Sequence, residues 1–241
     1  MSTTPIVALD VPSADDALAV VRTLGERCRF YKVGNELFTA AGPSVVERVR
    51  DTGARVFLDL KLHDIPNTVR GAARSAASLG ASLLTVHGVG GTEMVSAAVE
   101  GAGNQLGILV VTVLTSFDDR TLGEATGRPE ISASAEVARL ADVAAHAGAH
   151  GIVCSGAEAS AMRERFGERL ALLIPGIRMR GGAVHDQRRV VTPAEAVVAG
   201  ARYIVVGRAV TGAADPASAM DAVMAELESD GHCTTNTVSL A

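Results

Sequence analysis

Asp59, Lys61 and Asp64 lie within six residues in the segment FLDLKLHDIPNT, and they directly follow an apolar run. Side chains alternate between the two faces of a strand, so Asp59 and Lys61 share one face if this run is a strand. Burying a charge is costly unless an opposite charge pairs with it. A solvated salt bridge would contribute only about 0 to 1 kcal/mol to stability. The spacing therefore indicates a paired carboxylate and ammonium that serve chemistry.

Short apolar runs alternate with longer, alanine-rich amphipathic stretches around this segment. This alternation is typical of βα units that bury a parallel sheet. We expect strands at residues 6–9, 30–33, 55–60, 82–86, 107–114, 151–154, 171–174 and 203–206. We expect helices at residues 14–27, 43–52, 69–79, 92–101, 133–147, 158–166, 193–199 and 216–227. Eight such units predict a single-domain (β/α)8 barrel at residues 1–228, followed by a flexible tail at 229–241.

A polar or conformationally special residue follows each expected strand. In chain order these are Asp10, Lys32, Asp59 with Lys61, His87, Thr115 with Ser116, Ser155, Pro175 with Arg178, and Gly207 with Arg208. The carboxyl ends of barrel strands converge on one mouth, where active sites of this fold lie. A doubly wound sheet would gather such residues only near a switch point. Their presence at every strand end therefore favours the barrel.

The last two strand ends carry residue types that bind phosphate. Gly207 allows backbone N–H groups to approach an anion, while Arg178 and Arg208 supply planar groups of donors. Barrels often build a phosphate site in this place. We therefore expect a phosphorylated small molecule as the ligand, with Pro175 in the same segment and Gln187 adding an amide.

The composition argues against several other classes of protein. The formal net charge of -5 comes from 22 basic and 27 acidic residues mixed along the chain, so no basic stripe is available for nucleic acid or an anionic membrane. The longest apolar run, 108–114, is too short to span a bilayer, and no signal peptide is recognisable, so we expect a cytoplasmic protein. The three Cys and six His lack metal-ligand spacing, and no metal is expected.

The charged segment also belongs to a recognisable set of motifs. DLKLHDIPNT, the upstream ALD and KVG, and the later VLTS, PGIR, DQRRV-x-TP and VVGRAV together resemble the orotidine 5'-monophosphate decarboxylase family over residues 5–227. The resemblance implies decarboxylation of orotidine 5'-monophosphate to uridine 5'-monophosphate (UMP), the last step of pyrimidine nucleotide biosynthesis. It also implies that the reaction needs neither a metal nor an organic cofactor.

The same resemblance assigns roles to the charged residues. Lys61 would donate a proton to the base carbon that loses CO2, and Asp59 would lie beside the departing carboxylate. Lys32 would orient Asp59 and contact the ribose, whose hydroxyls Asp10 would also hold. Asp64 would complete the array from the neighbouring subunit of a homodimer.

The resemblance places the other candidate residues around the rest of the nucleotide. Thr115 and Ser116 would face the pyrimidine. The phosphate would be held by Gln187, Gly207 and Arg208, with Arg178 nearby. Thr68, in the central motif, and Pro175 are further expected contacts of the substrate.

Two alternatives stay open at this stage. A magnesium-dependent sugar-phosphate decarboxylase or aldolase of the same superfamily shares the Asp-x-Lys-x-x-Asp pattern, but such a relative would be expected to carry an acidic residue where this chain has Lys32. A catalytically silent, nucleotide-binding barrel is the second alternative, because a fold does not establish activity. The roles of His63 and His87 are left open.

Overall fold

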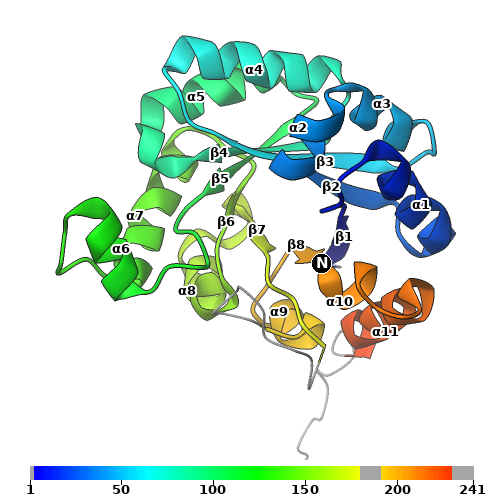
Figure 1. Cartoon of the computed structure of the whole chain (residues 1–241). Coiled ribbons are helices and arrows are strands. Elements are labelled where there is room, and N and C mark those ends of the chain that lie inside the picture. Colours follow the sequence, from blue (N-terminus) through cyan, green and yellow to red (C-terminus); the bar gives the residue numbers. More distant parts are fainter. Residues whose placement is uncertain (1–2, 180–190, 230–241) are drawn as a thin grey trace, which may run out of the picture.

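The computed structural model describes residues 3–179 and 191–229. Its centre is a closed barrel of parallel strands that follow one another in chain order (Figure 1). The strands are β1 (Thr4–Ala8), β2 (Phe30–Gly34), β3 (Arg55–Leu62), β4 (Leu83–His87), β5 (Gly107–Val111), β6 (Gly151–Val153), β7 (Ala171–Ile174) and β8 (Tyr203–Val206). The predicted (β/α)8 barrel is confirmed.

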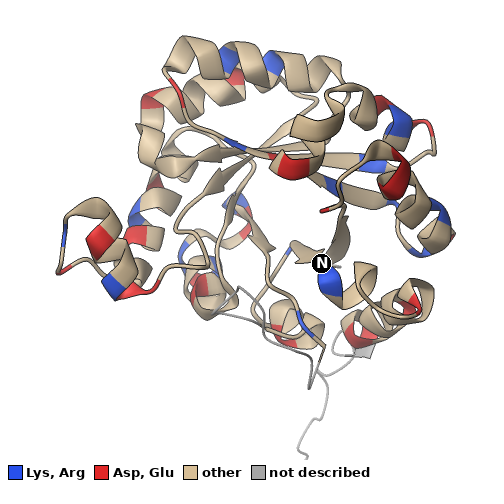
Figure 2. Cartoon of the chain, in the orientation of Figure 1, with Lys and Arg blue, Asp and Glu red and all other residues tan. Residues whose placement is uncertain are grey.

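Helices connect the strands and surround the barrel (Figure 1). They are α1 (Ala14–Leu24), α2 (Asn35–Ala41), α3 (Ser44–Arg50), α4 (Pro66–Ser78), α5 (Gly91–Ala102), α6 (Asp119–Thr126), α7 (Ala133–His146), α8 (Gly156–Phe166), α9 (Pro193–Val198), α10 (Arg208–Thr211) and α11 (Pro216–Ser229). Lys, Arg, Asp and Glu are spread over these outer helices without segregation by sign (Figure 2). No helix in the described ranges has the length and apolar character needed to cross a membrane.

Two kinds of boundary differ from those expected from the sequence. The helices α2, α6 and α10 were not expected. Helix α2 has seven residues and no side-chain cap, and α10 has four residues. Helices of this length are too short for helical periodicity to show in the sequence. Strand β5 ends at Val111, not at residue 114. The Thr112 backbone N–H, at 3.3 Å, and the Thr112 hydroxyl, at 2.7 Å, both donate to the carbonyl of Val153, the last residue of β6. The expected tail lies outside the described residues except for its first residue, Ser229, in α11.

The apolar core has two layers because each strand alternates its side chains between two faces. The interior of the barrel holds Ile6, Ala8, Phe30, Phe57, Leu83, Leu109, Leu173, Tyr203 and Val205. The opposite face of the strands packs against the helices in a larger cluster that includes Val7, Tyr31 and Leu58. On each of the first three strands, the residue two positions after the last of these interior side chains is charged. These residues are Asp10, Lys32 and Asp59. These charged residues therefore stand at the end of an apolar plug.

Candidate active site

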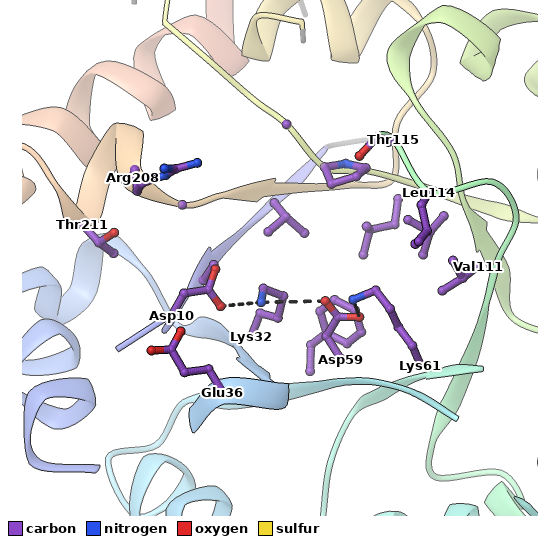
Figure 3. A pocket seen from close by; sticks show the side chains of 18 of the residues that line it. Asp10, Lys32, Glu36, Asp59, Lys61, Val111, Leu114, Thr115, Arg208 and Thr211 are labelled. Atoms are coloured by element: carbon purple, nitrogen blue, oxygen red, sulfur yellow. Dashed lines mark hydrogen bonds and ion pairs between the residues drawn. The ribbon is translucent and has the colours of Figure 1, made fainter. Parts of the chain in front are cut away.

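A pocket of about 570 Å³ opens at the carboxyl ends of the strands (Figure 3). The predicted site residues that line it are Asp10, Lys32, Asp59, Lys61, Thr115, Pro175, Arg178, Gly207 and Arg208. Apolar side chains of the barrel interior, including Phe57 and Leu173, form part of its wall. The pocket thus combines an apolar surface with a small number of convergent charges, as small-molecule sites do.

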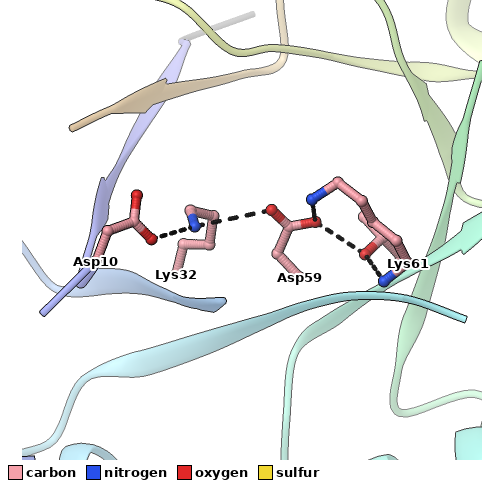
Figure 4. Close-up of polar contacts among 5 residues, drawn as sticks. Asp10, Lys32, Asp59 and Lys61 are labelled. Carbon is pink, nitrogen blue, oxygen red and sulfur yellow. Dashed lines mark hydrogen bonds and ion pairs between the residues drawn. The ribbon is translucent and has the colours of Figure 1, made fainter. Parts of the chain in front are cut away.

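Four charges of alternating sign form a chain across one side of the pocket (Figure 4). Lys32 Nζ lies 2.7 Å from Asp10 Oδ1 and 3.7 Å from Asp59 Oδ2. Lys61 Nζ lies 2.8 Å from Asp59 Oδ1. Each inner charge is therefore next to charges of the opposite sign, which offsets the cost of its burial.

The neighbours of Asp59 shift the pKa of its carboxyl group. Its side chain is only 15% exposed, and burial alone raises the pKa of its carboxyl group. The charges of Lys61 and Lys32, together with hydrogen bonds from Lys61 and Thr85, outweigh burial and hold that pKa below its ordinary value of 3.8. Asp59 is consequently a carboxylate at neutral pH.

Lys61 reaches the pocket through an irregular strand. Strands β3 and β4 change register between Leu58 and Leu62, and Lys61 has a φ of 49°. A non-glycine residue in this left-handed region costs about 1 to 3 kcal/mol, and such strain persists only where surrounding contacts impose it. The strand expected from the sequence ends at residue 60, so the structure extends it to Leu62 and places this distortion in the added part.

Gly34, at the end of β2, leaves the space in which Lys32 meets Asp10. A Cβ atom at Gly34 would lie 2.8 Å from Lys32 Nζ and 3.3 Å from Asp10 Oδ1. The Gly34 backbone is extended, with φ -94° and ψ -178°, so an alanine could adopt it without strain. The glycine is therefore required for the position of the ammonium group and not for the backbone.

Arg208, one of the residues predicted to bind phosphate, lies on the other side of the pocket from Lys61. Figure 3 shows Arg208 and Thr211 at one side and Lys61 at the other. Arg208 is the first residue of α10 and follows Gly207 directly. The Arg178 segment is held by its backbone N–H, which donates to the Val191 carbonyl at 3.0 Å. An anionic group could therefore bind at a distance from the carboxylate and ammonium pair.

Other predicted residues lie outside this pocket. Asp64, Thr68 and Ser116 are exposed, and the Asp64 carboxylate accepts a hydrogen bond from the Ile65 N–H at 2.6 Å. Ser155 is buried and caps α8 in a capping box with Glu158, so this strand-end residue has a structural role. Gln187 lies outside the described residues.

The two histidines left open by the sequence lie near each other. The rings of His63 and His87 are 5.8 Å apart between centroids. Burial, followed by the nearby His63 and Lys61, lowers the pKa of His87. Neither histidine lines the pocket.

Several residues in the pocket or next to its charged groups were not expected from the sequence. Glu36 and Thr211 line the pocket from α2 and α10, the short helices that periodicity did not reveal. Thr85 contacts both Asp59 and Lys61 from β4, and it is fully buried. Thr85 is two residues from both Leu83 and His87, so these three side chains point to the same face of the strand. The sequence could therefore have predicted that the Thr85 hydroxyl faces the barrel interior.

The described residues contain no group of three or more His, Cys, Asp or Glu side chains arranged to hold a metal ion. The two carboxylates of the charged chain that could attract a cation, Asp10 and Asp59, have the Lys32 ammonium between them.

Comparison with known proteins identifies the relatives of this chain. Residues 3–223 match the orotidine 5'-phosphate decarboxylase / HUMPS family. The chain belongs to this family. An orotidine 5'-phosphate decarboxylase of Anaeromyxobacter sp. (strain K) is 53% identical over 222 residues, which cover 91% of this chain and 96% of the relative. The enzyme of the same name from Halorhodospira halophila is 49% identical over 231 residues, which cover 94% and 96%.

Solved structures of the family show the same architecture. The crystal structure of orotidine 5'-phosphate decarboxylase from Lactobacillus acidophilus has a TM-score of 0.83 and 36% identity to this chain, with 95% of this chain and 100% of that chain covered. The barrel and the order of its elements are thus those of the family.

Replacing Gly34 by alanine should impair the site without unfolding the protein. The added Cβ would displace Lys32 Nζ, the end of a flexible side chain, so we expect the free energy of unfolding to change by less than about 1 kcal/mol. A displaced ammonium should lower kcat/KM by about 10-fold or more. Denaturant unfolding and steady-state kinetics with the substrate proposed below measure the two effects.

Gly71→Ala is a matched control, because a Cβ at Gly71 in α4 would meet nothing within 4 Å. This control should retain normal kcat/KM. Equal activity of the Gly34→Ala and Gly71→Ala proteins would contradict a role for Gly34 in placing Lys32.

Proposed function

We propose that this chain decarboxylates orotidine 5'-monophosphate to UMP and CO2, the last step of UMP biosynthesis, with Lys61 as the proton donor. Family membership and relatives of that name at about half identity support the activity. The observation that carries the mechanism is the 2.8 Å contact between Lys61 Nζ and Asp59 Oδ1 in the pocket. It provides an acidic N–H group directly beside a carboxylate.

The reaction breaks the bond between the base and its carboxylate and leaves an electron pair on the ring carbon. An ammonium group fixed next to that carbon stabilises the developing negative charge. It then transfers a proton to the carbon as a general acid. CO2 departs, the new C–H bond forms, and Lys61 regains its proton from solvent. The Asp59 carboxylate lies beside the departing group and keeps Lys61 in place.

The remaining residues hold the nucleotide on both sides of the reacting carbon. Lys32 and Asp10 are assigned to the ribose, and Thr115 and Ser116 to the pyrimidine. Thr68 and Pro175 are further expected contacts of the substrate. Arg208, Gly207, Arg178 and Gln187 are assigned to the phosphate. Binding energy from the phosphate can support catalysis at the distant carbon when it is used to orient the substrate.

We further propose a homodimer in which Asp64 completes the array of the neighbouring subunit. Asp64 is exposed at the mouth of the barrel and is followed by Ile65, whose exposure is 67%. Val89, after the adjacent strand β4, is 54% exposed. Contiguous exposed apolar patches mark surfaces that another protein covers, and these two residues follow paired strands. The expected cytoplasmic location also stays a prediction.

The purified protein should consume orotidine 5'-monophosphate in excess EDTA, because the proposed acid is a side chain. Loss of substrate absorbance measures turnover. Lys61→Ala should lower kcat by at least about 100-fold, the usual contribution of a positioned general acid, while the protein still binds UMP.

Each failure of this experiment has a defined meaning. Absence of turnover by the unaltered protein would contradict the assignment and favour a silent nucleotide-binding barrel. Turnover abolished by EDTA and restored by magnesium would favour the metal-dependent sugar-phosphate enzymes instead. Near-normal turnover by Lys61→Ala would refute its role as proton donor.

Mixing inactive Lys61→Ala and Asp64→Ala proteins should restore activity. Random exchange makes about half of the dimers hybrids, each with one intact site of two, so about a quarter of the unaltered activity should return. A mixture of Lys61→Ala with Asp59→Ala is the control, because these residues belong to the same subunit's site and no hybrid is intact. No recovery in the first mixture, despite demonstrated subunit exchange, would contradict the shared site.

A further inference from the structure

The backbone of Lys61 adopts a conformation that its own residue type disfavours. Lys61 is the only non-glycine residue in the described ranges with a positive φ, which is 49°. The register of β3 against β4 shifts at the same point, between Leu58 and Leu62. A lysine in this conformation needs a specific contact that holds it there.

Thr85 makes that contact from the neighbouring strand. The Lys61 backbone N–H donates to Thr85 Oγ1 at 2.9 Å. The same hydroxyl donates to Asp59 Oδ1, also at 2.9 Å. Because a hydroxyl has a single proton, accepting from Lys61 leaves that proton for the carboxylate. One oxygen atom therefore connects the backbone of Lys61 with the side chain of Asp59.

The surroundings of Thr85 make this connection rigid. Thr85 is fully buried on β4, between Leu84 and Val86, which are also fully buried. Asp59 Oδ1 receives both the Thr85 hydroxyl and Lys61 Nζ, while Asp59 Oδ2 faces Lys32. Both oxygens of the carboxylate thus have fixed neighbours, and its plane is set by partners on three strands.

We propose that Thr85 is a positioning residue for the decarboxylation: its hydroxyl holds Lys61 in the left-handed conformation and orients Asp59. The ammonium then faces the carbon that loses CO2, and the carboxylate lies beside the departing group. This inference rests on the proposed function. Thr85 does not line the pocket, so it acts through Asp59 and Lys61 and not on the substrate.

Thr85→Val removes the hydroxyl and keeps the branched shape, whereas Thr85→Ser keeps the hydroxyl. We expect kcat of Thr85→Val to fall by about 10- to 100-fold, because small misplacements of reacting groups have effects of this size. KM should change by less than about threefold, because the phosphate residues lie elsewhere in the pocket. Thr85→Ser should retain most of kcat.

Thr112→Val is the matched structural control. Thr112 is also buried, and its hydroxyl donates to the Val153 carbonyl at 2.7 Å without contacting the charged chain. Its kcat and KM should match those of the unaltered protein. A folded Thr85→Val protein with kcat within about twofold of normal would overturn the proposal. So would equal losses of kcat in the Val and Ser variants, or in the Thr85→Val and Thr112→Val variants.

A crystal structure of Thr85→Val separates this proposal from the proposed function. We expect Lys61 to return to a negative φ and its Nζ to leave Asp59 Oδ1. An unchanged Lys61 conformation would overturn the positioning role whatever the activity. If Thr85→Val does not fold, the Thr85→Ser structure takes its place, and it should retain both hydrogen bonds. If the unaltered protein does not consume substrate, the proposed function is contradicted. The conformation of Lys61 in the Thr85→Val structure still decides the positioning role of Thr85.

Discussion

The contact between the buried Asp59 carboxylate and the Lys61 ammonium is the interaction on which the rest of the site depends. A carboxylate with so little exposure is costly unless cations neutralise it, and here Lys61 and Lys32 do so from β3 and β2. The same arrangement keeps an acidic N–H group beside a negative charge, in a pocket with apolar walls. Electrostatic interactions are stronger in such surroundings than in water. The constraint that stabilises the charges therefore also prepares them for chemistry.

The barrel brings these opposite charges together because side chains alternate between the two faces of each strand. Inward apolar residues such as Phe57 form the plug, and the next inward position on each of the first strands carries a charge. Two short-range features accompany this arrangement: Gly34 leaves room for the Lys32 ammonium, and Lys61 contacts Asp59 within the part of β3 whose register shifts against β4. Arg208, which is proposed to bind the phosphate, lies across the pocket from Lys61, so the proposed binding and reacting groups are separated within one cavity.

Parity and periodicity were sufficient to predict the barrel, its strand order and the gathering of Asp10, Lys32, Asp59 and Lys61, because these depend on local alternation. They could not predict the left-handed Lys61 or its contact with Thr85, since a hydrogen bond between neighbouring strands depends on an irregular register. The helices that carry Glu36 and Thr211 were too short for periodicity. The proposed role of Asp64 requires a second subunit, which no pattern within one chain describes.

The pH at which Asp59 is protonated shows whether Lys61 and Lys32 neutralise this buried carboxylate. In protein labelled with 13C at aspartate carboxyl groups, the Asp59 signal, assigned by its loss in Asp59→Asn, can be followed by NMR as the pH falls. We expect Asp59 to stay ionised until the pH is below its ordinary pKa of 3.8, and we expect Lys61→Ala to raise this pKa because the largest opposing charge is lost. Protonation of Asp59 at or above 3.8 in the unaltered protein would contradict the account.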